Sequence, residues 1–126
     1  MKINELFDYD FVKGDFTNLS KFNFYGVYVI YDNKEEIVYI GSAYARTIKT
    51  RLGQYKSATD TGNTLAKSIA CKKYNCKSKD LTEDQKKEAV KDILQFKIMA
   101  IKHEDLEYKL IAKAKPRYNN CGKKEV

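Results

Sequence analysis

Two tyrosines lie where a predicted hairpin would bring their phenol groups side by side. Residues 25–31 and 37–41 have the β-branched and aromatic composition of buried strands, and a polar turn separates them. A two-residue loop at Asn33-Lys34 would place Tyr28 directly opposite Tyr39. The residues expected to share that sheet face are Tyr28, Tyr39, Ile30 and Ile37. The two phenols are either an ordinary aromatic cross-strand pair or part of a site.

A carboxylate falls inside the apolar stripe of another predicted element. Residues 104–114 form a predicted helix that ends before Pro116. The apolar residues that helical spacing places around Glu107 are Leu106, Leu110, Ile111 and Ala114. Such a carboxylate must be paired, coordinated or protonated, because burying it bare costs roughly several kcal/mol. The alternative is a glutamate at the edge of the stripe that reaches water or meets a lysine.

Arg51 is an unusual cation in this chain, because only three of its 24 basic residues are arginine. It comes just before Leu52 on a helix predicted for residues 46–56, beside the apolar face of that helix. A planar guanidinium suits a phosphate better than an ammonium group does. The alternative is an ordinary surface cation.

The remaining elements predict an α+β domain. Helices are expected over residues 64–74, after a break at 61–63, and from a capping box at Thr82 to about Leu94. Residues 95–101 predict a third strand. The order of the elements predicts a small three-stranded antiparallel sheet flanked by helices.

Length and composition suit one domain of 126 residues. We expect residues 1–22 to be an irregular or part-helical lead-in that packs on the domain, 23–120 to be the domain, and 121–126 to be a tail. No apolar stretch reaches the length of a membrane-spanning helix, and the first residues lack the apolar core of a secretory signal. Three cysteines do not make a disulfide framework, so a reducing cytoplasm is the expected compartment, with no membrane partner.

Basic residues concentrate after the first third of the chain. Residues 1–41 carry a net charge of −3 and residues 42–126 a net charge of +10. Such an excess indicates a polyanionic partner, nucleic acid first and an anionic membrane second, or else a solvated lysine-rich surface. The cations expected to contact nucleic acid are Arg46, Lys49, Lys67, Lys72 and Lys73.

Zinc is a weaker hypothesis. Cys71, Cys76, His103 and Cys121 add up to one set of three cysteines and a histidine. The four residues are scattered along the chain, so free thiols are the favoured interpretation.

Five short sequence motifs occur in a fixed order along the chain. They are Gly26-Val27-Tyr28, Tyr39-Ile40-Gly41, Arg51 within Ile48-Lys-Thr-Arg-Leu, Tyr55, and Glu107 with Leu110-Ile111, Pro116 and Asn119 behind it. Together they resemble the GIY-YIG nuclease superfamily over roughly residues 24–120, with Val27 in place of the middle isoleucine.

The resemblance implies a metal-dependent endonuclease that hydrolyses DNA phosphodiester bonds, of a restriction-like or mobile-element and phage type. The implied cofactor is one Mg²⁺ (or Mn²⁺), and the implied substrate is double-stranded DNA. By position in the motifs, Glu107 would be the metal ligand and Arg51 would contact the scissile phosphate. A homodimer is left open.

The same resemblance gives roles to the phenols. Tyr28 and Tyr39 would position or activate the attacking water, Tyr55 would support them, and Asn119 would order the site. Which tyrosine takes the proton is left open, since a phenol with a pKa near ~10 is a poor base at neutral pH unless a cation lowers it.

The chain departs from the repair-type members of the superfamily in one respect. Its stretch between Arg51 and Glu107 is longer and includes the lysine-rich segment 67–91. Sequence specificity would have to come from residues 1–22 and 56–92. A catalytically silent nucleic-acid-binding module of the same fold is the alternative function, and a protein-interaction scaffold is a third that leaves the basic excess unexplained.

Overall fold

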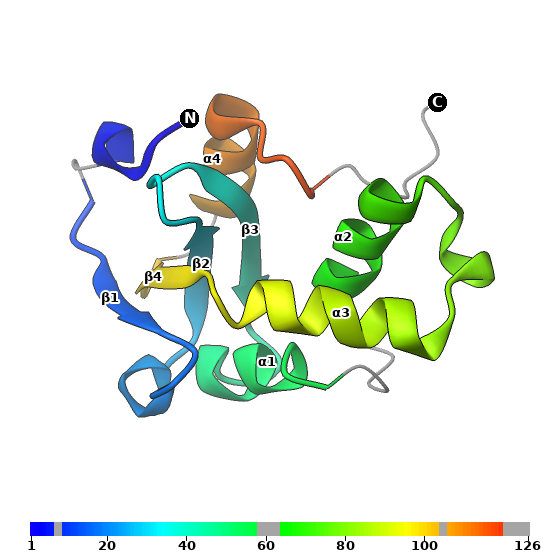
Figure 1. Ribbon diagram of the computed structural model, residues 1–126. Coiled ribbons are helices and arrows are strands. Elements are labelled where there is room, and N and C mark those ends of the chain that lie inside the picture. The colour runs from blue at the N-terminus through cyan, green and yellow to red at the C-terminus, as the bar shows by residue number, and fades with distance from the viewer. Residues whose placement is uncertain (7–8, 58–63, 104–105, 120–126) are drawn as a thin grey trace.

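The computed structural model describes residues 1–6, 9–57, 64–103 and 106–119, and these residues fold around one antiparallel sheet (Figure 1). The strands are β1 (Val12–Asp15), β2 (Gly26–Tyr31), β3 (Ile37–Ala43) and β4 (Lys97–Ile101). Their order in the sheet is β1-β4-β2-β3, so β3 is an edge strand. The α+β class and the antiparallel pairing are confirmed, and the sheet has four strands where three were expected.

Helices cover both faces of the sheet (Figure 1). The α-helices are α1 (Ile48–Gln54), α2 (Thr64–Tyr74), α3 (Glu83–Ile93) and α4 (Leu106–Ala114). Apolar residues of α1, α2 and α3 share one core with Tyr28 and Ile30, and we call this side of the sheet the tyrosine face. Apolar residues of α4 share the other core with Val27 and Val29, and we call that side the α4 face. Every residue of β2 is buried, because the strand lies between β3 and β4 with both faces covered.

The hairpin loop has three residues instead of the expected two. The amide of Glu35 donates to the carbonyl of Asp32 at 3.0 Å, and the amide of Asp32 donates to the carbonyl of Glu36 at 2.9 Å. The loop is therefore residues 33–35, and Glu35 closes it with a φ of 64°. The assumption of a two-residue turn was wrong, because a turn followed by one left-handed residue is another regular way to close a hairpin.

The longer loop changes the strand register without moving the tyrosines to different faces. Tyr28 pairs with Gly41, and Tyr39 pairs with Ile30, so the two tyrosines are diagonal neighbours instead of direct partners. Between Tyr39 and the loop, β3 has a bulge at Val38. Ile30 pairs with Tyr39, but the next residue of β2, Tyr31, pairs with Ile37. The bulge turns Ile37 onto the α4 face, so the expectation that it shares a face with Tyr28 was wrong.

The helices agree closely with the sequence-based expectation. Helix α2 spans the expected residues 64–74, and α3 begins after a complete capping box at Thr82 and Gln85. Helix α1 is shorter than expected because Thr47 caps it, its hydroxyl accepting a bond from the amide of Thr50 at 3.3 Å. The expected break at 61–63 and the expected start of the last helix at 104 lie outside the described residues.

The lead-in contributes the strand that the sequence did not predict. Strand β1 pairs with β4, and its residues Val-Lys-Gly-Asp lack the apolar alternation that signals a strand. Short 3-10 helices occur at Ile3–Leu6 (η1), Ser20–Phe22 (η2) and Ser78–Asp80 (η3). Phe16, Leu19 and Phe22 are buried in the core of the tyrosine face, so the lead-in packs against the sheet.

Candidate active site

Three tyrosine rings meet on the tyrosine face, between the β2–β3 hairpin and helix α1. The ring centroids of Tyr28 and Tyr39 are 6.4 Å apart, and those of Tyr28 and Tyr55 are 6.1 Å apart. The centroids of Tyr39 and Tyr55 are 6.2 Å apart, with the rings nearly perpendicular. Tyr55 caps the C-terminus of α1, and Leu52 and Ile48, one and two turns earlier, anchor the same side of the helix in the core. The sequence-predicted tyrosines are thus brought together in one cluster.

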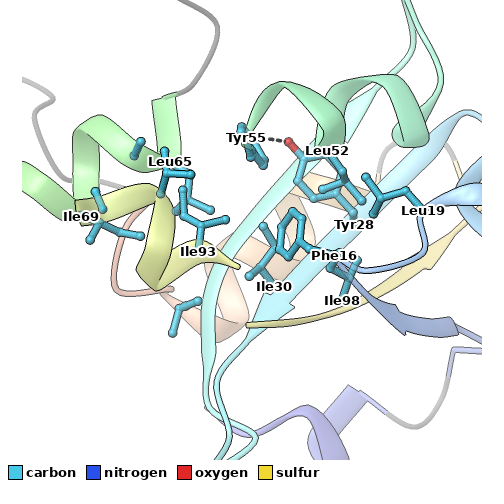
Figure 2. Close-up of a cluster of buried hydrophobic side chains, with 14 of the residues drawn as sticks. Phe16, Leu19, Tyr28, Ile30, Leu52, Tyr55, Leu65, Ile69, Ile93 and Ile98 are labelled. Carbon is cyan, nitrogen blue, oxygen red and sulfur yellow. Dashed lines mark hydrogen bonds between the residues drawn. The ribbon is translucent and has the colours of Figure 1, made fainter. Parts of the chain in front are cut away.

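Two of the three phenols are inside the protein. Tyr28 and Tyr55 are 1% and 0% exposed, and their hydroxyl groups share a hydrogen bond of 2.5 Å, drawn as a dashed line in Figure 2. Burial raises the pKa of both phenols well above the usual value, and their electrostatic interactions with the neighbouring phenols raise it further. Tyr39 is only partly buried, so it is the phenol of the cluster that reaches the surface.

Arg51 lies against this cluster, on α1 and one turn before its C-cap residue Tyr55. Its guanidinium carbon is 4.9 Å from the centre of the Tyr55 ring, and its Nη1 donates to Oε1 of Gln54 at 2.8 Å. Burial lowers the pKa of Arg51, but the neighbouring phenols outweigh it and raise the pKa above its usual value. The side chain is half-buried, so a fixed positive charge is presented at the edge of the aromatic cluster.

Tyr28 and Tyr39 share one sheet face, as the sequence predicted, and both interact electrostatically with Arg51. The further expectation that the two phenols also point toward Glu107 was wrong, because that carboxylate lies on the α4 face.

Two motif glycines make room for this arrangement. A Cβ on Gly41 would lie 2.5 Å from Cζ of Tyr28 and closer still to its hydroxyl oxygen, so only glycine lets the phenol lie over β3. At Gly26, φ is +155°, and a Cβ would collide with the carbonyl oxygen of Ile101 in β4. Gly41 thus leaves space for the ring of Tyr28, and Gly26 allows β4 to approach the start of β2.

Glu107 approaches the same strand from the α4 face. It lies in the first turn of α4, and its Oε1 accepts a hydrogen bond of 2.9 Å from the hydroxyl of Ser42. Ser42 follows Gly41 in β3 and pairs with Val27 of the α4 face. The carboxylate and the tyrosine cluster therefore lie on opposite faces of the outermost strand. The partner of the carboxylate is a hydroxyl, and the sequence interpretation did not name Ser42, whose only signal was a polar residue ending an apolar strand.

The donor set around Glu107 suits a hard divalent cation. Mg²⁺ is commonly bound by one or two carboxylates, with water and substrate phosphates completing its coordination. One half-buried carboxylate held by a hydroxyl group meets that requirement. Within the described residues, no group of three or more His, Cys, Asp or Glu side chains could hold a metal by itself.

The described part of the chain gives no support to a zinc site. Cys71 is buried and Cys76 half-buried, both as free thiols, and Cys121 lies outside the described residues. The ring of His103 packs edge-on against Tyr9, with centroids 6.3 Å apart.

Asn119 holds the outer edge of β3 next to Tyr39. Its Nδ2 donates to the carbonyl of Ile40 at 2.7 Å, and its Oδ1 accepts from the amide of Ile40 at 2.8 Å. The amide of Tyr118 donates to the carbonyl of Val38 at 2.9 Å. The segment after α4 thus pairs with the edge strand on both sides of Tyr39, which fixes that residue's backbone.

The basic residues expected to contact nucleic acid have different surroundings. Arg46 and Lys49 are exposed, before and within α1, and Lys67 of α2 is partly buried. Lys72 donates to the carbonyl of Arg117 at 2.8 Å, whereas Lys73 forms an ion pair with Asp92 of α3 at 3.6 Å. Lys72 is thus drawn toward the segment that borders β3, and Lys73 toward α3.

No helix in the described part of the chain is long and apolar enough to cross a membrane. No curated protein and no solved structure gives a significant match to the sequence. The family model of the GIY-YIG catalytic domain matches residues 24–119, which include the tyrosine cluster, Arg51, Glu107 and Asn119. Because this match covers most of the 126 residues, the chain belongs to the GIY-YIG nuclease superfamily.

Proposed function

We propose that the chain is a metal-dependent endonuclease that hydrolyses phosphodiester bonds of double-stranded DNA, in a restriction-like or mobile-element role. The observation that carries the proposal is the half-buried guanidinium of Arg51 on the ring of Tyr55, 4.9 Å from its centre, beside the accessible Tyr39. A cation held in this way, at the edge of an aromatic cluster, suits a phosphate oxygen. The net charge of +7 favours DNA as the bearer of that phosphate.

Arg51 is the residue we assign to the scissile phosphate. Negative charge builds on the phosphate oxygens during displacement, and a preorganised guanidinium stabilises that charge without having to move. Gln54 accepts a hydrogen bond from Nη1 and thereby fixes the direction of the fork. The stacking on Tyr55 restrains the rest of the side chain.

One phenol of the cluster is assigned to contact the attacking water, and the other two are assigned to position it. We assign the attacking water to Tyr39, because it is the phenol of the cluster that reaches the surface. Tyr28 and Tyr55 stay protonated at neutral pH, since burial raises the pKa of both, and we assign them positioning roles. Their shared hydrogen bond fixes the two rings against which Tyr39 packs, and Arg51 lies over one of them, that of Tyr55.

Glu107 is the residue we assign to Mg²⁺ or Mn²⁺. The hydroxyl of Ser42 orients the carboxylate by its hydrogen bond to Oε1. Glu107 and Arg51 lie on opposite faces of β3, so a divalent cation held by Glu107 would supply a positive charge to the leaving oxygen only of a phosphate that spans the edge of that strand. Asn119 acts as a positioning residue through the backbone of Ile40.

The test is cleavage of a supercoiled plasmid with and without Mg²⁺. We expect nicking or linearisation with Mg²⁺ only, and we expect Glu107→Gln to abolish it while DNA binding survives, since the substitution removes a ligand charge but keeps the shape. Glu88→Gln is the matched control: this carboxylate is exposed, its contact with Lys91 is a surface ion pair of 3.9 Å, and its loss should leave cleavage unchanged.

Two outcomes would contradict the proposal. Binding without Mg²⁺-dependent cleavage by the wild-type protein would indicate the silent nucleic-acid-binding module. Activity of Glu107→Gln within about tenfold of wild type, a barrier change of only ~1.4 kcal/mol, would remove Glu107 from the metal role.

A further inference from the structure

Two cations are gathered around one ring at the outer edge of β3. The ammonium of Lys72 and the guanidinium carbon of Arg117 each lie 5.8 Å from the centre of the Tyr118 ring. The ammonium also donates to the main-chain carbonyl of Arg117 at 2.8 Å, which holds the two residues together. We call Lys72, Arg117 and Tyr118 the Tyr118 patch.

The patch borders the candidate active site along the strand. The amide of Tyr118 is bonded to the carbonyl of Val38, the residue before Tyr39, at 2.9 Å. The ring of Tyr118 packs against the same apolar core as Tyr39. The backbone of Tyr118 is therefore bonded to the strand residue next to Tyr39, and its ring lies on the tyrosine face.

The charges of the patch are incompletely balanced. Among the described residues, Asp32 forms an ion pair with the patch, with Oδ2 3.8 Å from the guanidinium of Arg117, and half of the Arg117 side chain is exposed. Two positive charges near one ring repel each other, and one distant carboxylate offsets only part of that repulsion. An anion that approaches the patch would be attracted by both cations. The neighbouring Lys73 differs, because its ion pair with Asp92 turns it toward α3.

We propose that the Tyr118 patch binds a second phosphate of the nucleic-acid strand, next to the one that Arg51 contacts. The inference rests on the proposed function, since it extends the same substrate along β3. The strand would run beside the outer edge of β3, with Arg51 and Tyr39 at the scissile phosphate and Lys72 and Arg117 at a flanking one. Arg117 thereby joins the nucleic-acid-binding residues, and Lys73 leaves them.

The test is the salt dependence of DNA binding in EDTA, where no cleavage can occur, measured by fluorescence anisotropy with a labelled 20-base-pair duplex. Each lost phosphate contact should reduce the slope of log K against log [salt] by about 0.9, which corresponds to about eightfold weaker binding at 0.1 M salt. We expect this change in Lys72→Ala and in Arg117→Ala. Lys73→Ala, one residue away on α2, is the matched control and should keep the wild-type slope.

Charge-conserving variants separate a lost phosphate contact from a damaged fold. Lys72→Arg and Arg117→Lys should keep a slope close to that of wild type. Asp32→Asn should bind more tightly, because it removes the competing carboxylate while its side-chain oxygen can still accept the turn bonds from Lys34 and Glu36. Wild-type slopes in both alanine variants, or no DNA binding by the wild-type protein, would overturn the inference. Reduced slopes in a protein that never cleaves would support it and refute only the proposed nuclease activity.

Discussion

Gly41→Ala tests whether the tyrosine cluster is packed as tightly as the structure shows. An added Cβ would lie 2.5 Å from Cζ and 2.9 Å from Cε2 of Tyr28, whereas ordinary contact begins at 3.4 Å. The ring would have to move by about 0.9 Å to restore that contact. Tyr28 is 1% exposed and bonded to Tyr55, so no free space receives it.

The expected cost follows from two opposing effects. Overpacking of a buried site costs about 1–3 kcal/mol. Replacing glycine by alanine within a strand stabilises the folded state by about 0.5–1 kcal/mol, because the unfolded chain has less conformational freedom to lose. We therefore expect the free energy of unfolding to fall by about 1–2 kcal/mol and Tm to fall by about 3–8 °C. Cleavage should fall as well, since the displaced ring no longer positions Tyr39.

The assay is urea unfolding of wild type and variants, with Gly53→Ala as the matched control. Gly53 lies in α1, and nothing would come within 4 Å of a Cβ added there. Alanine at that helical position should stabilise the protein by about 0.5–1 kcal/mol. The same substitution should therefore have opposite signs at the two glycines. If Gly41→Ala is as stable as wild type, or shifts in the same direction as Gly53→Ala, the close packing of Tyr28 on β3 is refuted.

Three further predictions concern the residues around that packing. Arg51→Lys should recover little of the cleavage rate that Arg51→Ala loses, because a point charge lacks the two-pronged geometry of a guanidinium. Single-turnover cleavage rates at saturating enzyme measure this. A wild-type rate for Arg51→Ala would mean that Arg51 only anchors the DNA. Asn119→Ala removes two hydrogen bonds to Ile40, of 2.7 and 2.8 Å, and should lower the free energy of unfolding by about 1–3 kcal/mol, checked by urea unfolding with a cleavage assay beside it. Burial raises the pKa of Tyr28, so the unfolded chain loses this proton first, and stability should decline above about pH 10 by up to ~1.4 kcal/mol per pH unit for that phenol. Unfolding midpoints from pH 8 to 11 test this, and an unchanged slope in Tyr28→Phe would contradict it.

Local patterns in the sequence were sufficient for several elements. The capping box at Thr82 and Gln85 predicted the start of α3, because cap hydrogen bonds form between residues close in the chain. The composition of residues 25–31 predicted the central strand, since only a segment buried on both faces is so continuously apolar. The spacing of Leu106, Leu110 and Ala114 predicted the buried side of α4.

The exact hairpin register could not be predicted from composition. A three-residue loop closed by Glu35 and a bulge beside Tyr39 moved the pairing, yet the net shift was even for Tyr28 and Tyr39 and kept both on one face. A strand has a side-chain period of two, so an even shift preserves the face and an odd one reverses it. Ile37, beyond the bulge, was predicted on the wrong face for that reason.

The sequence by itself therefore determined which residues are available for the chemistry. The tertiary structure decided which of them are buried, which are accessible, and on which face of the sheet each one lies. Tyr28 and Tyr39 have the same side chain, and only the packing of α1 over the hairpin buries one and leaves the other accessible. Glu107 lies on the opposite face of β3 because α4 covers that face. Strand β1 is held by its pairing with β4, for which its own four residues give no signal. The burial and the charge balance of a side chain depend on neighbours that are distant in the chain. For that reason the fold, and not the order of residues, decides which phenol is exposed to solvent and which are buried.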